Sequence, residues 1–247
     1  MDDILSIWNT SLAHLGDGTE IQALNEDSKQ ARVMRRFYYG LLKSLISSKN
    51  WFWATIFQQL TLVSIYPTPE WPYAYAYPSN CLRLTRLWNW HHTDDIDNYV
   101  QYLKVNNGTQ KIIVSEYGDA SVLAGTPFAP IQPTPPITVD PTQIPVAQFV
   151  AYTDNVGLYP EMFKQALAFI LAAYAAPSLP GVGQEDLRKS NLELGNAALN
   201  QALADDMNES RQYTNKKSII EKAGAGDFGY WANGAVYSAY NAGNFNA

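Results

Sequence analysis

The sequence predicts an α+β fold, in which a helical bundle of about four helices carries a small antiparallel β-domain. Three observations lead to this prediction. Apolar residues recur at helical spacing near both ends of the chain. The middle of the chain alternates aromatic and β-branched residues with turn signals. Prolines gather in one stretch, and glycine, alanine and asparagine dominate the last thirty positions or so, which indicates extended arms.

The domain organisation follows from the order of these patterns. Residues 1–50 and 153–217 are expected to form one helical bundle, in which the second segment is a helical hairpin. The β-domain, residues 51–152, is inserted between the second helix and this hairpin, and it includes a proline-rich arm over residues 124–146. Residues 218–247 form a separate C-terminal tail.

Composition narrows the class of protein. An apolar content of 47% is typical of a folded chain, and a net charge of -6 argues against a protein that wraps nucleic acid tightly. Cys81 is the single cysteine, so no intrachain disulfide framework is possible. The first three residues lack the basic region of a signal peptide, and the longest apolar run, residues 166–176, is too short to span a bilayer. We therefore expect a soluble, non-secreted protein without a membrane span.

Two helices are predicted in the first fifty residues. The first follows Asp2 or Asp3 and ends at Gly16, and the second follows Asn25 or Asp27. The expected buried seam of the first consists of Leu5, Trp8, Leu12 and Leu15. That of the second consists of Met34, Tyr38, Leu41 and Leu45.

The early half of the second helix also carries a basic stripe of Lys29, Arg32, Arg35 and Arg36. One interpretation is a solvated face that pairs with neighbouring acidic residues. The other is a subunit–subunit contact against an acidic helix, such as the predicted helix that holds Asp205 and Asp206. The second interpretation makes Arg32, Arg35, Arg36, Asp205 and Asp206 candidate contact residues.

The β-domain is predicted from short runs of strand character. The runs cover residues 57–63, 73–77, 81–90, 99–105, 112–115 and 146–152. Asn106-Asn107-Gly108 predicts a hairpin between the fourth and fifth runs, because Asn-Gly tolerates the positive φ of a type I′ turn.

Tyrosines at alternate positions give the second of these runs two possible roles. Period two places Tyr73, Tyr75 and Tyr77 on one side of an extended segment. This side is either the buried face of a sheet, or, with Trp71, Trp88 and Trp90 nearby, an exposed platform on which sugars or bases stack. The platform leads to the alternative function, a carbohydrate-binding accessory module.

The C-terminal hairpin is predicted from proline positions and apolar spacing. Pro160 occupies a first helical turn, and Pro177 stops that helix. The expected seam of this helix is Phe163, Leu167, Ile170 and Tyr174. Residues 185–211 form the next helix, with a stripe of Leu192, Leu199, Leu203 and Met207.

The C-terminal tail holds too many aromatics for an inert linker. It is either disordered or becomes ordered against a partner, with its aromatic residues as anchors. The candidate partner-binding residues are Phe228, Tyr230, Trp231, Tyr237, Tyr240 and Phe245.

No pattern in the sequence predicts catalysis. His91, His92, Asp94, Asp95 and Asp97 lack the spacing of zinc sites, which favours a solvent-exposed loop. No phosphate-binding loop and no nucleophile elbow occur in the sequence. Gly224, Gly226 and Gly229 match the glycine spacing of a dinucleotide-binding motif, but no strand precedes them, so we discount this match. We therefore expect no enzyme, no metal site and no cofactor.

Three segments of the chain form a recognisable series. The first is the helix–turn–helix opening that ends in Lys49-Asn50-Trp51-Phe52-Trp53-Ala54. The second is Tyr73-Ala74-Tyr75-Ala76-Tyr77-Pro78-Ser79-Asn80-Cys81-Leu82-Arg83. The third is Val150-Ala151-Tyr152-Thr153-Asp154 followed by Tyr159-Pro160-Glu161-Met162-Phe163 and an alanine-rich helix. In this order and spacing they resemble the tail tubular protein A family of short-tailed bacteriophages. The resemblance covers most of residues 1–212 and departs at 124–146 and after 218.

The resemblance implies a structural virion protein. Members form a head-to-tail adaptor ring of about twelve copies below the portal, which extends the DNA channel and presents docking sites for the tail nozzle and fibres. Its implied partners are therefore other copies of the chain, the portal protein, the nozzle protein and fibres, with double-stranded DNA passing through unbound. The implied location is the virion neck, assembled in the host cytoplasm. An acidic chain suits such a channel, because like charge keeps phosphates from sticking.

Overall fold

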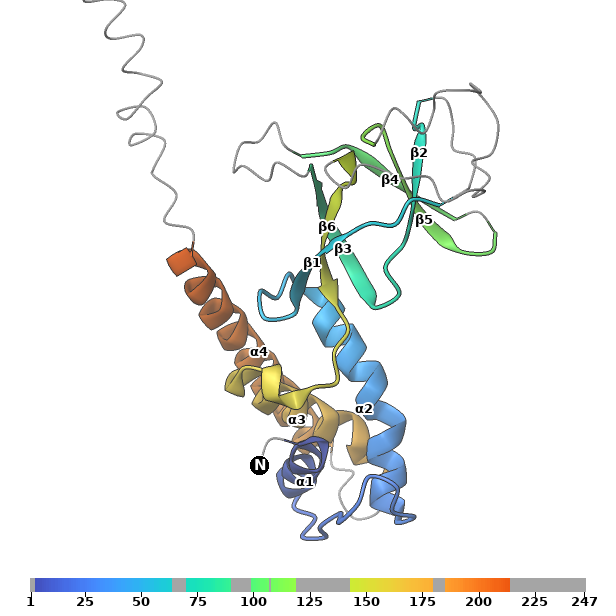
Figure 1. Cartoon of the computed structure of the whole chain (residues 1–247). Helices are drawn as coiled ribbons and strands as arrows, with labels where there is room; N and C mark the ends of the chain where they lie inside the picture. The colour runs from blue at the N-terminus through green and yellow to red at the C-terminus, as the bar shows by residue number, and fades with distance from the viewer. Residues whose placement is uncertain are drawn as a thin grey trace, which may run out of the picture. The chain divides into compact units, whose positions relative to one another are not determined.

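The computed structural model describes residues 3–63, 70–89, 99–106, 108–118, 143–179 and 185–213 (Figure 1). The chain divides into two compact units, Met1–Asp206 and Met207–Ala247, and the description below concerns the first of them. The predicted α+β fold is confirmed. Among the described residues there are four α-helices and two antiparallel three-stranded sheets.

The helices lie before and after the sheets in the sequence. They are α1 (Ile4–His14), α2 (Lys29–Ser48), α3 (Glu161–Ala175) and α4 (Glu185–Tyr213). Asp3 caps α1 as predicted, since its Oδ1 accepts a hydrogen bond from the Ser6 amide at 2.8 Å. The cap of α2 is Ser28, not Asn25 or Asp27, and its Oγ accepts from the Ala31 amide at 3.2 Å. Pro160 directly precedes α3 and Glu161 opens its first turn, where a carboxylate is favourable.

Each sheet has one central strand. The first has the order β1 (Thr55–Gln59), β6 (Val146–Ala151), β3 (Cys81–Trp88), and the second has the order β2 (Tyr73–Ala76), β5 (Lys111–Ser115), β4 (Tyr102–Asn106). The predicted β4–β5 hairpin is confirmed, with Gly108 at φ 88°. Asn106 pairs with Lys111, so the connection is wider than a two-residue type I′ turn.

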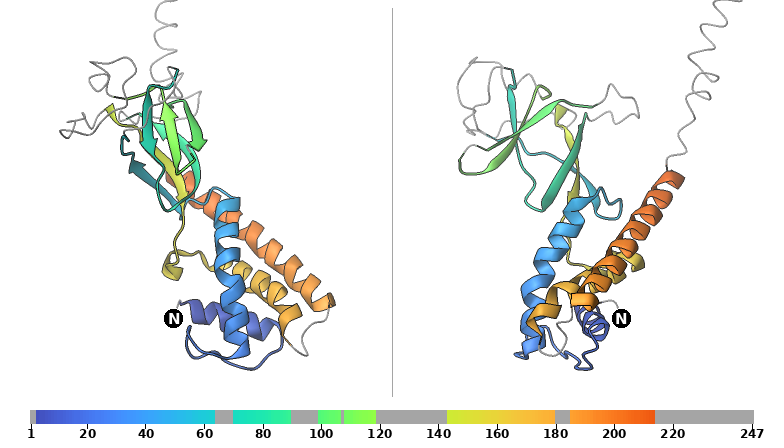
Figure 2. Two further views of the ribbon diagram at one scale, coloured as in Figure 1. Left: turned by 90° about the vertical axis from the view of Figure 1, so that its right-hand side faces the viewer. Right: turned by 180° about the vertical axis from the view of Figure 1, so that it is seen from behind.

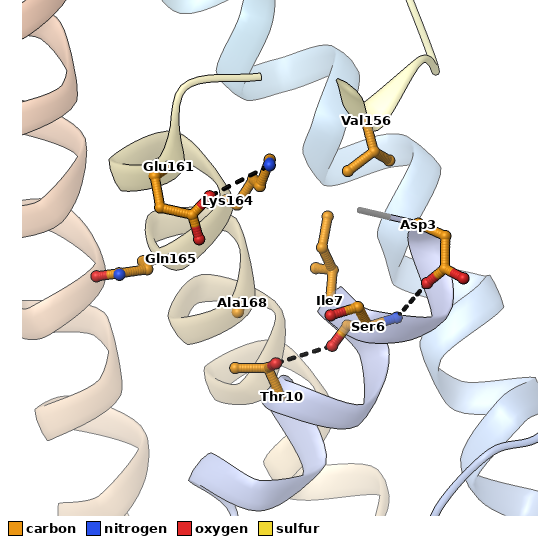
Figure 3. A pocket seen from close by; sticks show the side chains of 9 residues that line it. All are labelled: Asp3, Ser6, Ile7, Thr10, Val156, Glu161, Lys164, Gln165 and Ala168. Atoms are coloured by element: carbon orange, nitrogen blue, oxygen red, sulfur yellow. Dashed lines mark hydrogen bonds and ion pairs between the residues drawn. The ribbon is translucent and has the colours of Figure 1, made fainter. Parts of the chain in front are cut away.

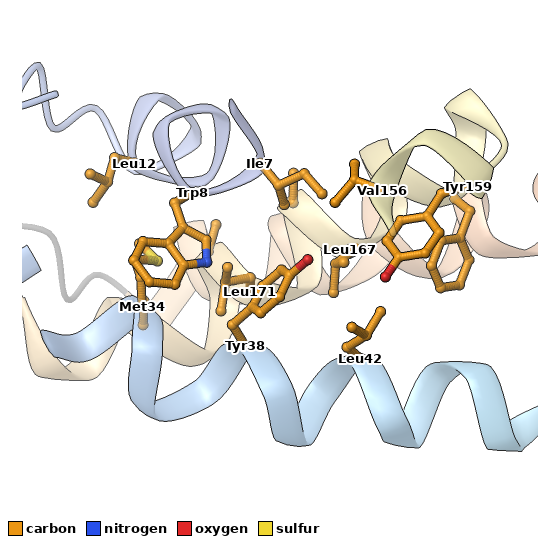
Figure 4. Close-up of a cluster of buried hydrophobic side chains, with 14 of the residues drawn as sticks. Ile7, Trp8, Leu12, Met34, Tyr38, Leu42, Val156, Tyr159, Leu167 and Leu171 are labelled. Atoms are coloured by element: carbon orange, nitrogen blue, oxygen red, sulfur yellow. The ribbon is translucent and has the colours of Figure 1, made fainter. Parts of the chain in front are cut away.

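The largest hydrophobic core lies among the helices, whose arrangement can be followed in Figure 2 and whose buried side chains are drawn in Figure 4. Trp8 of α1 and Tyr38 of α2 meet edge to face, with ring centroids 6.0 Å apart. The buried stripe of α2 is Ala31, Met34, Tyr38, Leu42 and Ile46. Leu41 and Leu45 of the predicted seam are half-buried and pack against this core, while Leu42 and Ile46, one position later, are fully buried, because steps of four residues drift around a helix.

α3 is buried on most sides. Phe163, Leu167 and Ile170 are buried as predicted, whereas Tyr174 is exposed and Leu171 takes its place in the core. Alanines fill much of the remaining surface of α3, and they let neighbouring helices approach closely. α3 therefore serves as the central helix against which α1 and α2 pack.

Candidate functional site

Four aromatic rings cluster where the helical core meets the first sheet. Trp51 and Trp53 lie just after α2, and Tyr159 and Phe163 lie at the start of α3. The Phe163 ring centroid is 5.2 Å from that of Trp51, 5.0 Å from that of Trp53 and 5.4 Å from that of Tyr159. Edge-to-face and tilted rings at these distances stabilise one another beyond their buried area. We call these four residues the aromatic junction.

Three hydrogen bonds, two from backbone amides and one from a side chain, connect the region of the junction with the first sheet. The Ala151 amide donates to the Ala54 carbonyl at 2.8 Å, and the Tyr152 amide donates to the Asn80 carbonyl at 2.8 Å. The Arg83 guanidinium donates to the carbonyl of Ser48 at the end of α2, at 3.3 Å. Residues near 50, 80 and 151–163 thus meet at one place in the fold.

Asp206 of α4 completes the junction. It is only 3% exposed, and its two carboxylate oxygens accept from the amides of Phe52 at 2.8 Å and Trp53 at 3.3 Å. A buried carboxylate needs such donors, since a buried charge without partners is very costly. Asp206 therefore has an intrachain role, and of the two predicted acidic contact residues only Asp205 lies nearer the surface, where it accepts from Gln201 at 2.8 Å.

The rest of α4 rests on the core through small and polar residues. Within 185–206 its buried residues are Asn191, Gly195, Ala198, Ala202 and Asp206. Leu192, Leu199 and Leu203 of the predicted stripe are half-buried, and Met207, in the second unit, is 51% exposed. A Cβ on Gly195 would lie 2.6 Å from Cγ1 of Ile170 in α3, so only glycine permits this closeness. The Asn191 side chain donates to the carbonyl of His14 at 3.4 Å.

The outward face of α4 is polar and built of small side chains. Asp186, Glu193, Ala197, Asn200 and Ala204 are all exposed. Their spacings of seven, four, three and four residues place them on one side of the helix, opposite the buried residues. We call these five residues the outer face of α4.

The exposed side of α2 is basic along its length. Lys29, Arg32, Arg36 and Lys43 are exposed and follow one another at spacings of three, four and seven, with Gly40 in the interval. At 1.5 Å per residue this cationic ridge is about 21 Å long. The helix contains no acidic residue. Only Arg32 of the four has an ion pair within the described part of the chain, with Asp27 at 3.5 Å, and both partners are well exposed.

Two features of the ridge oppose helix stability. Lys29 and Arg32 lie in the first turn of α2, where the helix dipole disfavours cations by about 0.3–1 kcal/mol each. Gly40 costs about 1 kcal/mol relative to alanine in a helix interior. A Cβ at Gly40 would meet nothing within 4 Å, so packing inside this chain does not require glycine there. Violations of local preference of this kind are typical of functional surfaces.

Arg35 differs from the other predicted contact residues of α2. Its Nη2 donates to the carbonyls of Leu24 at 2.6 Å and Glu26 at 3.1 Å, which holds the loop before α2 in place. Arg36 lies 5.8 Å from the centroid of the Phe37 ring, and its side chain remains at the surface. The structure therefore brings Arg32 and Arg36, but not Arg35, to one outward face.

The tyrosine row is part of the sheet core. Tyr73 and Tyr75 are buried, and the Tyr75 hydroxyl donates to the Tyr117 carbonyl at 2.8 Å. Tyr77 is half-buried against the same hydrophobic cluster. Trp88 is also buried, and Trp90 lies outside the described residues. The buried-face interpretation is confirmed, and the exposed rings that a sugar platform needs are not found at Tyr73, Tyr75 or Trp88.

The outer side of the second sheet is apolar and partly covered, because Ala74, Ile112 and Val114 form a small buried cluster there, against which Val63 and Trp71 pack. Leu103 of β4 is opposite Val114 of β5, and Val105 is opposite Ile112. The two β5 residues are buried, whereas Leu103 is 48% exposed and Val105 is also exposed. Exposed apolar side chains next to an apolar face are typical of sites where another protein docks.

A small polar pocket lies between α1 and α3 (Figure 3). Its volume is about 80 Å³, and its lining residues are Asp3, Ser6, Ile7, Thr10, Val156, Glu161, Lys164, Gln165 and Ala168. Lys164 and Glu161 pair across its mouth at 3.2 Å. This volume is far below the roughly 300–1,000 Å³ of typical ligand sites.

The remaining predicted features are the single cysteine, the candidate metal ligands, the two arms and the possibility of a membrane span. Cys81 is half-buried, its thiol donates to the Tyr77 hydroxyl at 3.3 Å, and burial raises the pKa of the thiol. Across the described ranges, no three histidine, cysteine, aspartate or glutamate side chains are grouped as a metal site would require. Residues 91–97, most of the proline-rich arm and the six tail aromatics lie outside the described residues. No described helix is long and apolar enough to cross a membrane.

Neither a family model nor a curated protein matches the chain.

Proposed function

We propose that this protein is a structural component of a bacteriophage virion, an adaptor that joins the portal to the tail. In this role several copies form a ring, which extends the DNA channel and offers docking sites to the nozzle or the fibres. DNA passes through without specific binding, and the protein is assembled in the host cytoplasm.

The observation that carries this proposal is the aromatic junction. The residues on which the family resemblance rests are far apart in the sequence, yet Trp51, Trp53, Tyr159 and Phe163 pack against one another. Asn80 of the remaining segment is hydrogen-bonded to the same region. These contacts connect the helical core with the first sheet, and residues whose contacts are structural favour an architectural function over a catalytic one.

Exposed apolar residues support assembly with partners. Phe52 next to the junction, Phe57 on β1 and Leu103 on β4 each have about half of their surface exposed. Burying such side chains against a partner favours binding by roughly 25 cal/mol for each Å² of apolar surface removed from water. The outer side of the second sheet is the candidate surface for the nozzle or the fibres.

Light scattering tests the proposal directly. We expect the purified chain to gain mass in steps of its own 27.6 kDa on addition of portal complex, and to elute with the portal. Portal that already carries a full ring of the chain should gain no further mass. A chain that keeps its mass and elutes apart from portal would contradict the adaptor function.

A further inference from the structure

We infer that the cationic ridge of α2 binds the outer face of α4 in a second copy of this chain. The inference rests on the ring proposed above and names the contact that would build it. It adds Lys29 and Lys43 to Arg32 and Arg36, omits Arg35, which is engaged within its own chain, and takes Asp186 and Glu193 in place of Asp205 and Asp206. Lys43 is exposed and also lies over the Tyr152 ring of its own chain, 5.1 Å from the centroid.

Charge is the first argument. The ridge presents four cations without an acidic residue on its helix, in a protein whose net charge is -6. The outer face of α4 carries Asp186 and Glu193; the exposed Lys189 lies beside them and pairs with Glu185 at 3.9 Å. Complementary charge of this kind sets the register of an interface and speeds association.

Side-chain size is the second argument. Gly40 lies in the middle of the ridge, and a Cβ there would point into open space. Ala197 and Ala204 are exposed on the outer face of α4. Small residues on both helices allow two helix backbones to approach closely, so a crossing at Gly40 and Ala197 would leave Arg36 and Lys43 on either side of the contact.

Geometry is the third argument. In Figure 1 and in the right-hand view of Figure 2, α3 lies between α2 and α4. The ridge and the outer face each point away from the buried side of their helix, so they are separate surfaces of one subunit. Contact between two different surfaces is head-to-tail, and such contacts produce rings when the rotation closes.

Thiol cross-linking tests the contact. In a Cys81→Ser background, Gly40→Cys and Ala197→Cys are combined in one chain and treated with a short thiol-specific cross-linker, with and without portal. We expect a ladder of dimers, trimers and larger species, because each subunit contributes one thiol to each of two contacts. Each single-cysteine variant is the control and should stay below a trimer. Failure of the double variant to exceed the controls would overturn the inference.

Charge reversal gives a second test, in which recovery of assembly in a mixture shows that both variants are still folded. Arg36→Glu/Lys43→Glu alone, and Asp186→Lys/Glu193→Lys alone, should each weaken self-association by about tenfold or more, since like charges then face each other. An equimolar mixture of the two variants should assemble again, because alternating copies restore opposite charges. The control, Lys49→Glu/Lys111→Glu, changes net charge equally at exposed positions off the ridge. Lack of recovery in the mixture would count against the contact.

The outcomes separate this contact from the proposed function. A portal-bound ring without a cross-linked ladder would exclude the contact and leave the adaptor function standing. A ladder without portal binding would do the reverse. If Arg36→Glu/Lys43→Glu instead abolished binding to labelled duplex DNA and left cross-linking unchanged, the partner of the ridge would be nucleic acid and the inference would be wrong.

Discussion

Asp206 shows how one side chain can secure a whole helix. Its carboxylate is the acceptor for two consecutive, partly buried amides, so its loss would leave both donors without this partner. We expect Asp206→Ala to lower the free energy of unfolding by about 2–3 kcal/mol, measured by urea denaturation. Asp206→Asn keeps one carbonyl oxygen and should lose less.

Asp205→Ala is the matched control for this prediction. Asp205 accepts a hydrogen bond from Gln201 on the same helix, and such a pair stabilises a helix by only about 0.2–0.5 kcal/mol. Equal losses in the Asp205 and Asp206 variants would contradict the intrachain role of Asp206.

Gly195 is a second residue whose environment permits no larger side chain. The added Cβ of Gly195→Ala would lie 2.6 Å from Ile170 Cγ1 and 3.3 Å from the Ile170 backbone nitrogen. Backbone cannot move aside as a flexible side chain can, so we expect a loss of about 1–3 kcal/mol in the free energy of unfolding. A thermal midpoint equal to that of the parent chain would show that α4 does not approach α3 this closely.

His14 gives the fold a pH dependence. Its ring stacks on Phe169 with centroids 4.0 Å apart, and burial lowers its pKa from the ordinary value of 6.5. As the pH falls through 6.5, the unfolded chain therefore takes up the proton first, and stability decreases until the folded pKa is passed. Above pH 6.5 both states are neutral and the residue contributes no pH dependence.

The measurement for His14 is a comparison of stability at pH 7.5 and pH 5.5. The parent chain should lose more stability on acidification than His14→Gln, which cannot take up this proton. An identical loss in both chains would mean that other groups account for the pH dependence.

At the scale of elements, α2 combines a well-packed buried stripe with an exposed side that opposes its own stability. Gly40→Ala should raise the free energy of unfolding by about 0.4–1 kcal/mol, because the φ of Gly40 is not positive and the new methyl meets no atom. The same change at Gly195 should have the opposite sign. Urea denaturation of the two variants side by side checks both, and a loss of stability at Gly40 would refute the open surface there.

The elements also show what sequence patterns could and could not predict. Periodicity located four helices and the β4–β5 hairpin, because the amphipathic signals there are strong and local. It predicted the buried side of α4 only in part: Leu199 and Leu203 are half-buried against the core, but the fully buried residues include Asn191, Gly195 and Ala202. An apolar-spacing rule cannot identify a helix face that packs through small residues and hydrogen bonds. The buried role of Asp206 could not be predicted for a different reason: its amide donors are about 150 residues away in the chain.

At the scale of the molecule, the tail after residue 217 is separable from the core in the adaptor proposal. Deletion of residues 218–247 should leave the urea midpoint of the remaining chain unchanged, because the main hydrophobic clusters consist of residues before position 206. The same deletion should weaken attachment to portal or to the next tail component, measured by co-elution. Normal joining of heads and tails by the truncated chain would show that the six tail aromatics are dispensable.

The function was less accessible from the sequence than the fold. Contacts between copies depend on which side of a helix faces outward, and for Arg35 and Arg36, neighbours in the chain, that became clear only from their partners. The buried tyrosine row likewise could not be distinguished from a platform by alternation alone, because both require the same period of two.

The hydrogen bonds of Asp206 also have a consequence for biosynthesis. The acceptor follows its amide donor at Phe52 by 154 residues, so at 5–20 residues per second the ribosome needs roughly 8–30 s to supply it. During that interval the end of α2 and the first sheet can form only with two uncapped amides. A chain interrupted before position 206 would keep that defect permanently, which makes incomplete copies less stable and easier for cellular proteases to remove.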